Sequence, residues 1–185
     1  MIPDMLDPKA TEGLPVPEEL SVLPSKDAVV FPYMMVPLAV HSEQWVKLIE
    51  EASSGSRVIG LFALKNEEGA PSADNLHEIG TAAAVVRMLR MPDGTAQVLL
   101  QGIARVQIEE HTQQDPHPRA RVRQLTELAT KTAELEALHR NLASQFQRVV
   151  SLSPTLPNEL AITAANLADG GRLADFVAAA LNLSL

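Results

Sequence analysis

The sequence predicts an α+β protein in which the strands come first and the helices last. Short apolar runs, separated by prolines and polar loops, fill residues 20–125, as is usual for strands. Apolar residues recur at helical spacing after residue 126. We therefore expect a β-rich N-terminal lobe over residues 20–125 and a helical lobe over residues 126–185.

Residues 1–19 are expected to form a flexible acidic leader, because they combine prolines with acidic side chains and show little apolar periodicity. The stretch that follows contains Pro24, Pro32 and Pro37. Proline lacks an N–H and restricts the residue before it, so a helix is excluded here. A strand, a proline-containing loop and a second strand are expected up to Val40.

A helix is expected to begin near Ser42, a residue type that favours helix N-termini. Its apolar face would consist of Trp45, Leu48, Ile49 and Ala52, which follow the helical period. The apolar run at residues 58–64 then fits a short strand that is buried on both faces.

Two long strands are predicted at residues 80–91 and 95–110, joined by the turn Pro92-Asp93-Gly94. An Asp-Gly pair between β-rich runs is a strong hairpin signal. A further strand is predicted at residues 119–125, where Ala120 and Val122 share one face.

The helical lobe is expected to contain three helices. The first spans residues 127–152, and the second begins near Pro157 and ends at Gly170-Gly171, which fits a glycine C-cap. The third carries Leu173, Phe176 and Val177 on one face. Because that helix runs to an apolar end without a polar tail, we expect the lobe to be truncated at its C-terminus.

Composition argues against several classes of function. The chain contains no cysteine, which excludes disulfides and thiolate metal sites. Its net charge is −8 and it has no basic cluster, which disfavours nucleic-acid binding. No apolar run approaches the ~20 residues of a membrane span, and no signal peptide is visible. A cytoplasmic protein without membrane partners is expected.

No motif indicates an enzyme, so we assign no catalytic, cofactor-binding or metal-binding residue. The phosphate-loop motif Gly-x-x-x-x-Gly-Lys-Ser/Thr, the motif Gly-x-Gly-x-x-Gly and the Gly-x-Ser-x-Gly elbow are all absent from the sequence. His111, Asp115 and His117 share one loop, but their spacing matches no known zinc motif. A polar hairpin end, with Pro116 and Pro118 beside these residues, is the favoured explanation.

Apolar side chains in loops and near turns remain as candidates for function. Methionine is flexible and polarizable, and it suits surfaces that accept many sequences. The alternative is that these side chains fill the core of the β lobe or cover its mouth. The candidate substrate-binding residues are Phe31, Tyr33, Met34, Met35, Met88, Leu89 and Met91.

Several blocks, in order, resemble the N-terminal domain of the ATP-dependent Lon protease family over about residues 20–185. They are Leu23-Pro24-Ser25-Lys26-Asp27-Ala28-Val29-Val30-Phe31-Pro32, Val36-Pro37-Leu38-Ala39-Val40, Glu78-Ile79-Gly80-Thr81-Ala82-Ala83, Val98-Leu99-Leu100-Gln101-Gly102-Ile103-Ala104-Arg105-Val106 and Arg172-Leu173-Ala174-Asp175-Phe176-Val177-Ala178. Two positions depart from the family pattern: Tyr33 stands where glycine is common, and Lys26 replaces the usual arginine.

The resemblance implies a PUA-like pseudo-barrel of mostly antiparallel strands followed by a helical bundle. It implies a non-catalytic domain that captures unfolded, damaged or degron-bearing proteins and helps subunits to assemble into a homo-hexamer. ATP and magnesium would bind only in an ATPase module outside this chain, and the serine–lysine protease module would lie outside it as well. The alternative is a stand-alone adaptor or small-ligand-binding protein of the same fold.

Overall fold

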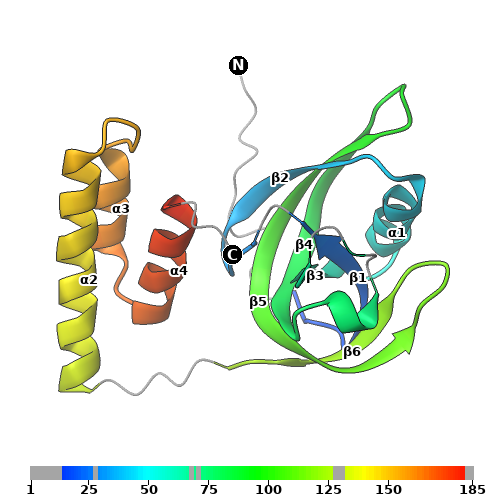
Figure 1. Ribbon diagram of the computed structural model, residues 1–185, viewed down its shortest axis with the longest axis horizontal. Coiled ribbons are helices and arrows are strands. Elements are labelled where there is room, and N and C mark those ends of the chain that lie inside the picture. Colours follow the sequence, from blue (N-terminus) through cyan, green and yellow to red (C-terminus); the bar gives the residue numbers. More distant parts are fainter. Residues whose placement is uncertain (1–13, 27–28, 67–68, 70–71, 127–131, 182–185) are drawn as a thin grey trace. The chain divides into compact units, whose positions relative to one another are not determined.

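The computed structural model describes residues 14–26, 29–66, 69, 72–126 and 132–181 (Figure 1). The chain divides into two compact units, Met1–Leu125 and Thr126–Leu185. Most of the predicted leader and the last four residues lie outside the described part of the chain. Each unit has hydrophobic core clusters of its own.

The first unit is built on one six-stranded sheet in the order β2-β5-β4-β3-β1-β6. An additional pairing joins β5 to β6 and closes five of the strands into a ring. Only β1 and β3 run parallel, and every other pair is antiparallel. The strands are β1 (Glu19–Ser25), β2 (Met35–Val40), β3 (Val58–Ala63), β4 (Ile79–Arg90), β5 (Ala96–Gln113) and β6 (Arg119–Gln124).

The 18 residues of β5 allow this closure, because one strand serves two parts of the sheet. Its first half pairs with β2, and its second half pairs with β6. Figure 1 shows β5 curving along the whole unit, with the β4–β5 hairpin projecting from one end. The predicted mostly antiparallel pseudo-barrel is confirmed.

Two core clusters fill the first unit, and β3 contributes to both. Val58 and Phe62 face a cluster that takes residues from all five strands of the ring. Ile59 and Leu61 face the other cluster, which also includes the buried face of helix α1 (Glu43–Ser54). Strand β3 is thus buried on both faces, as its continuous apolar run predicts.

Helix α1 begins after Ser42, as predicted, but the Ser42 side chain makes no capping hydrogen bond. Its buried residues are Val46, Leu48, Ile49 and Ala52. Trp45, predicted on the apolar face, is only partly buried against the same core. The predicted apolar face is therefore correct except at its first residue, where Val46 is fully buried and Trp45 is not.

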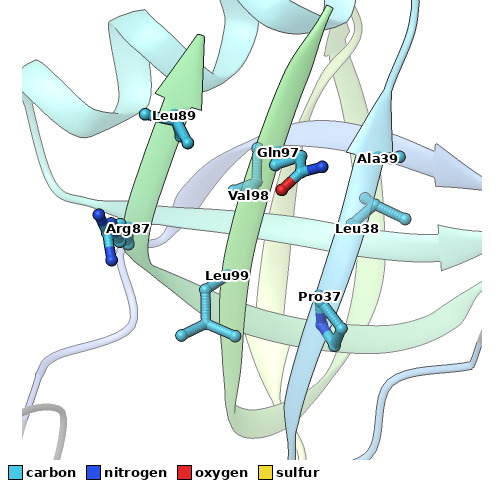
Figure 2. A pocket seen from close by; sticks show the side chains of 8 residues that line it. All are labelled: Pro37, Leu38, Ala39, Arg87, Leu89, Gln97, Val98 and Leu99. Atoms are coloured by element: carbon cyan, nitrogen blue, oxygen red, sulfur yellow. The ribbon is translucent and has the colours of Figure 1, made fainter. Parts of the chain in front are cut away.

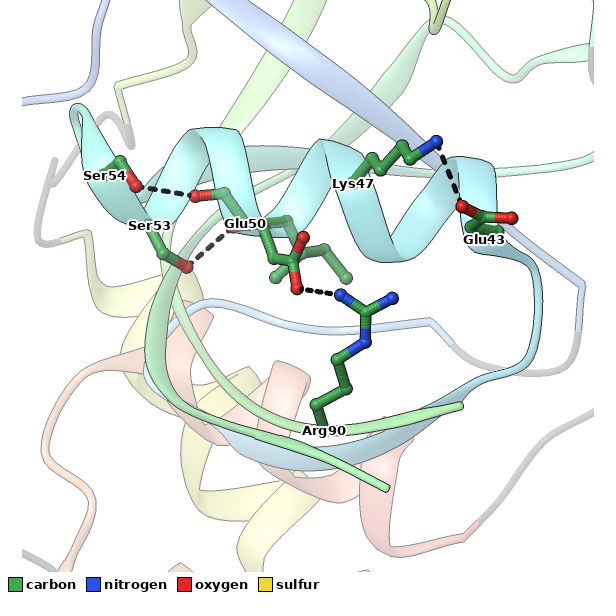
Figure 3. A network of polar contacts seen from close by, with 7 residues as sticks. Glu43, Lys47, Glu50, Ser53, Ser54 and Arg90 are labelled. Atoms are coloured by element: carbon green, nitrogen blue, oxygen red, sulfur yellow. Dashed lines mark hydrogen bonds and ion pairs between the residues drawn. The ribbon is translucent and has the colours of Figure 1, made fainter. Parts of the chain in front are cut away.

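Polar contacts of α1 are drawn in Figure 3. Lys47 pairs with Glu43 at 3.0 Å, and Arg90 of β4 pairs with Glu50 at 2.9 Å. The Ser53 and Ser54 hydroxyls donate to the carbonyls of Ile49 and Glu50. All these groups are at least partly exposed, so the two ion pairs contribute little to stability. The pair between Glu50 and Arg90 links the helix to the β4–β5 hairpin.

The second unit contains α2 (Ala133–Leu152), α3 (Glu159–Asn166) and α4 (Gly170–Ala180). Thr132 caps α2 by accepting a hydrogen bond from the Leu135 N–H at 3.1 Å. The core of the unit consists of Phe146, Val150, Ala164, Leu173 and Val177. A short 3-10 turn, η2 (Ala73–Asn75), completes the elements and belongs to the first unit.

The prediction that Gly170-Gly171 ends the second helix is wrong. Helix α3 ends at Asn166, and the two glycines form the first turn of α4. The reason is Asp169, whose carboxylate accepts a hydrogen bond from the Arg172 N–H at 2.8 Å and caps a helix start. Neither glycine has the positive φ of a left-handed C-cap.

Candidate functional site

A groove of about 420 Å³ crosses the outer face of β2, β5 and β4 (Figure 2). Strand β5 lies in the middle, with β2 and β4 on its two sides. The lining is mostly apolar, with one cation and one amide among its side chains. The residues are Pro37, Leu38, Ala39, Arg87, Leu89, Gln97, Val98 and Leu99.

The strand register explains why these side chains meet. Pro37 lies opposite Leu99, and Leu99 lies opposite Arg87. In the next row on the same face, Ala39 lies opposite Gln97 and Gln97 lies opposite Leu89. The side chains of the intervening residues Val98 and Leu100 join the core, and Leu38 packs against it, although Leu38 and Val98 also contribute to the lining of the groove. The groove is therefore the uncovered face of a three-stranded segment whose other face is buried.

The predicted loop residues form a tight turn just before β2. Phe31, Pro32, Tyr33 and Met34 make a four-residue turn in which the Met34 N–H donates to the Phe31 carbonyl at 3.3 Å. Tyr33 has φ +67 and occupies the third position, where a type II turn requires a positive φ and favours glycine. Tyr33 as a residue is 55% exposed. The turn thus displays an aromatic side chain on a strained backbone.

Hydrogen bonds and close packing hold this turn on the barrel. The Tyr33 N–H donates to the Gly102 carbonyl at 2.8 Å, and the Gly102 N–H donates to the Met34 carbonyl at 2.9 Å. The buried Thr81 hydroxyl donates to the Val30 carbonyl at 2.6 Å. Gly102 is needed because a Cβ there would overlap the Phe31 carbonyl. The turn lies on the face of β5 that also carries Leu100, opposite the groove.

The predicted candidate residues therefore lie on two surfaces. Leu89 lines the groove with 49% exposure, and Met35 lies on the same face of β2 as Pro37. Phe31, Tyr33 and Met34 belong to the turn. Met88 packs against the core, and Met91 is half-buried at the start of the hairpin turn. The role of all seven in substrate binding stays a prediction.

Sequence reasoning predicted only Leu89 among the groove residues and missed Pro37, Leu38, Ala39, Arg87, Gln97, Val98 and Leu99. The alternation of exposed and buried positions along a hairpin offers a signal for Arg87, Gln97 and Leu99. Pairing of β2 with β5 joins residues about sixty positions apart, and no local pattern specifies that contact. The contribution of β2 to the groove could therefore not be predicted from the sequence.

Replacing Tyr33 with glycine is expected to stabilise the first unit by about 0.5–1 kcal/mol. A non-glycine residue in the left-handed region costs roughly 1–2 kcal/mol, and the greater unfolded-state freedom of glycine returns about 0.5–1 kcal/mol of that. Urea unfolding followed by the fluorescence of Trp45, the single tryptophan, measures the change. Tyr33→Ala is the control, because it removes the ring but keeps the Cβ. An equal gain in both variants would show that strain is not the cause.

His117 of the histidine loop has contacts of a structural kind. Among the residues that the structure describes, no group of three or more His, Cys, Asp or Glu side chains is placed to hold a metal ion. His117 is buried, and its Nε2 lies 3.6 Å from Glu51 of α1. The Gln113 amide donates to the His117 carbonyl at 3.0 Å. The first contact joins the β5–β6 connection to α1, and the second lies within the connection itself.

Among the carboxylates that the structure describes, Glu43 and Asp93 have a lowered pKa, and both lie outside the groove. A hydrogen bond and the positive charge of Lys47 lower the pKa of Glu43. Hydrogen bonds from the Thr95 hydroxyl and N–H lower the pKa of Asp93 at the β4–β5 turn. Both carboxylates are exposed, Glu43 in the first turn of α1 and Asp93 in the turn between β4 and β5.

Within the described ranges of the chain, no helix combines the length and apolarity needed to cross a membrane.

A family model described as the ATP-dependent protease La (LON) substrate-binding domain matches residues 19–185. The chain is 43% identical over 183 residues to the Lon protease of Roseiflexus castenholzii and 40% identical over 170 residues to that of Dictyoglomus thermophilum. These matches cover 97% and 92% of this chain but 22% of each relative. The chain thus spans about a fifth of the length of the curated relatives it matches.

Solved structures with a similar fold are also Lon domains. The N-terminal domain of Mycobacterium avium complex Lon protease matches with a TM-score of 0.55 and 17% identity, covering 90% of this chain and 100% of that one. The Lon N-terminal domain protein from Xanthomonas campestris matches with a TM-score of 0.50 and 16% identity, covering 85% and 95%. At these identities the likeness shows the fold alone, which confirms the predicted α+β class. The family model and the relatives show that this chain belongs to the Lon protease family and corresponds to its N-terminal substrate-binding domain.

Proposed function

We propose that this chain is the non-catalytic substrate-recognition part of an ATP-dependent Lon serine protease and that it captures unfolded, damaged or degron-bearing proteins in the cytoplasm. The observation that carries this proposal is an exposed, mostly apolar groove on a domain of the Lon substrate-binding family. Catalysis, ATP and magnesium would belong to other parts of the parent protein, whose relatives are several times longer than this chain.

The groove suits polypeptides whose apolar side chains are accessible. A folded protein buries most of its large apolar side chains, whereas an unfolded one exposes them. Arg87 and Gln97 add polar contacts beside Leu89 and Leu99, so the groove sets few sequence requirements. Ordering a disordered partner costs about 2–5 kcal/mol, which keeps the affinity modest, with Kd values on the order of micromolar. Modest affinity allows the substrate to be passed on.

The proposal is tested by titrating this chain with one protein in two states. A reduced and carboxymethylated protein that cannot refold is compared with its native, disulfide-bonded form. Binding of the unfolded form with a micromolar Kd, and negligible binding of the native form, is expected from isothermal titration calorimetry. Equal or absent binding of both forms would refute the proposal.

Replacing Leu89 with aspartate is expected to weaken capture of the unfolded protein at least tenfold. The new charge would lie within the apolar groove and would have to be desolvated when substrate binds. Leu89 is on the exposed face of β4, so folding should be retained, and Trp45 fluorescence checks this. Leu138→Asp is the matched control, since Leu138 is a similarly exposed leucine on α2 of the second unit. A comparable loss in both variants would show that the groove is not the capture site.

We also propose that the helical unit contributes contacts between subunits in a homo-hexamer. Several of its large apolar side chains are exposed, among them Leu138 at 58%, Leu152 at 74% and Ile162 at 65%. Such side chains are common where helices associate. The same two variants discriminate the roles: in the full-length parent, Leu138→Asp should reduce the hexamer seen by sedimentation velocity, and Leu89→Asp should not.

A further inference from the structure

Strand β2 forms an edge of the sheet. In the part of the chain that the structure describes, it pairs with β5 alone. An edge strand presents unpaired backbone N–H and C=O groups on its open side. The groove begins at this same strand, since Pro37 and Ala39 line it (Figure 2).

The register identifies the backbone groups on the open side. The Gly102 N–H donates to the Met34 carbonyl, and this pair continues the register in which Val36 lies opposite Leu100. In an antiparallel ladder, bonded and non-bonded pairs alternate. Val36, Leu38 and Val40 therefore bond to β5. The backbone groups of Met35, Pro37 and Ala39 point to the open edge.

We propose that an extended substrate segment adds to this edge as a further strand. Its backbone would bond to Met35, Pro37 and Ala39, and its alternate side chains would lie over the groove. This inference rests on the proposed function and specifies how the substrate is held. Main-chain hydrogen bonds do not read the sequence, so this mode suits a domain that must accept many unfolded proteins.

Pro37 limits the strength of this pairing. It has no N–H, so the centre of the edge offers an acceptor but no donor. Proline on an edge strand is a common device against irreversible sheet growth. An added substrate strand loses one hydrogen bond at this position, which favours release.

Pro37 also favours a substrate strand over a second copy of β2. In a symmetric antiparallel pair centred on Pro37, both strands would lack the central donor, and neither central carbonyl would receive a hydrogen bond. A proline-free substrate strand still donates to the Pro37 carbonyl. The edge is therefore better matched to an extended polypeptide of another protein.

The test uses a capped seven-residue peptide of alternating valine and lysine with a fluorescent label. Residues directly opposite each other share a face, so valines placed over the groove direct their N–H groups to β2. N-methylation of the central valine is expected to weaken binding at least tenfold. N-methylation of a neighbouring lysine, whose N–H points away, should change binding by no more than about twofold. Equal effects at both positions, or no binding of the parent peptide, would overturn the proposal.

A variant of the protein provides the second arm. Pro37→Val restores the missing donor and should tighten peptide binding roughly threefold to tenfold. Pro154→Val, in the connection between α2 and α3, is the control and should leave binding unchanged. Unchanged affinity in Pro37→Val, or dimerisation by sedimentation velocity without tighter peptide binding, would overturn strand addition. Binding that is lost in Leu89→Asp but insensitive to the methylation pattern would overturn strand addition and leave the proposed function intact.

Discussion

Replacing Gly102 with alanine is expected to lower the free energy of unfolding of the first unit by about 3 kcal/mol. A Cβ at this position would overlap the Phe31 carbonyl and lie 3.1 Å from the Pro32 Cα. Both neighbours are backbone atoms of a turn that is hydrogen-bonded to Gly102 itself, so they cannot yield without losing those bonds. Overpacking of this kind typically costs 1–3 kcal/mol, and backbone overlap places the site at the upper end. Urea unfolding followed by Trp45 fluorescence measures the loss.

Gly170→Ala is the control for this prediction. Gly170 lies in the first turn of helix α4, where alanine is well tolerated, and its Cβ would lie 3.7 Å from the Leu135 side chain, an ordinary contact. We expect a change within about 0.5 kcal/mol, as for most surface substitutions. If Gly102→Ala were equally mild, the turn would have moved without cost. The position of the turn from Phe31 to Met34 against β5 would then not be fixed by the fold.

The fold was predictable where the pattern is local. The apolar run at residues 58–64 indicated a strand with two buried faces, and Val58 and Ile59 do belong to different cores. The Asp93-Gly94 pair marked the hairpin, with Gly94 at φ +86. Each signal is contained within a few residues, so periodicity and turn chemistry were enough to read it.

Features that depend on distant residues were not predictable in the same way. The closure of the ring needs a pairing of β5 with β6 in addition to its pairings with β4 and β2. The sequence of β5 does not indicate how many strands pair with it. The Gly170-Gly171 prediction was wrong because a glycine pair fits a helix end as well as a helix start. The capping carboxylate of Asp169 decided between them.

The candidate site, too, was predictable only where the sequence pattern is local. Pro32 indicated a turn, and the departure at Tyr33 from the glycine common in the family coincides with a positive φ. The strand alternation on β4 separates Leu89, which lines the groove, from Met88, which packs against the core. A list of apolar residues could not make that distinction without the strand register. The face of each residue, and not its type, determines whether a substrate can reach it.

Replacing Phe146 with alanine is expected to unfold the helical unit while the first unit stays folded. Phe146 is 2% exposed and meets Phe176 edge to face, with ring centroids 6.1 Å apart. Loss of a buried phenylalanine costs about 3–5 kcal/mol, which is comparable with the whole stability of a helical unit this small. Far-ultraviolet circular dichroism should show the loss of α2, α3 and α4, and the Trp45 unfolding curve of the first unit should keep its midpoint.

Leu152→Ala is the control, since Leu152 lies on the same helix but is 74% exposed, and its replacement should leave the helical signal unchanged. A joint shift of the helical and Trp45 signals in Phe146→Ala would instead show that the chain unfolds as one cooperative body. The groove is lined entirely by residues of the first unit. Phe146→Ala should therefore still bind the unfolded protein, and in the full-length parent it should fail to assemble. That outcome would separate the capture of substrate from the contacts between subunits within one domain of the protease.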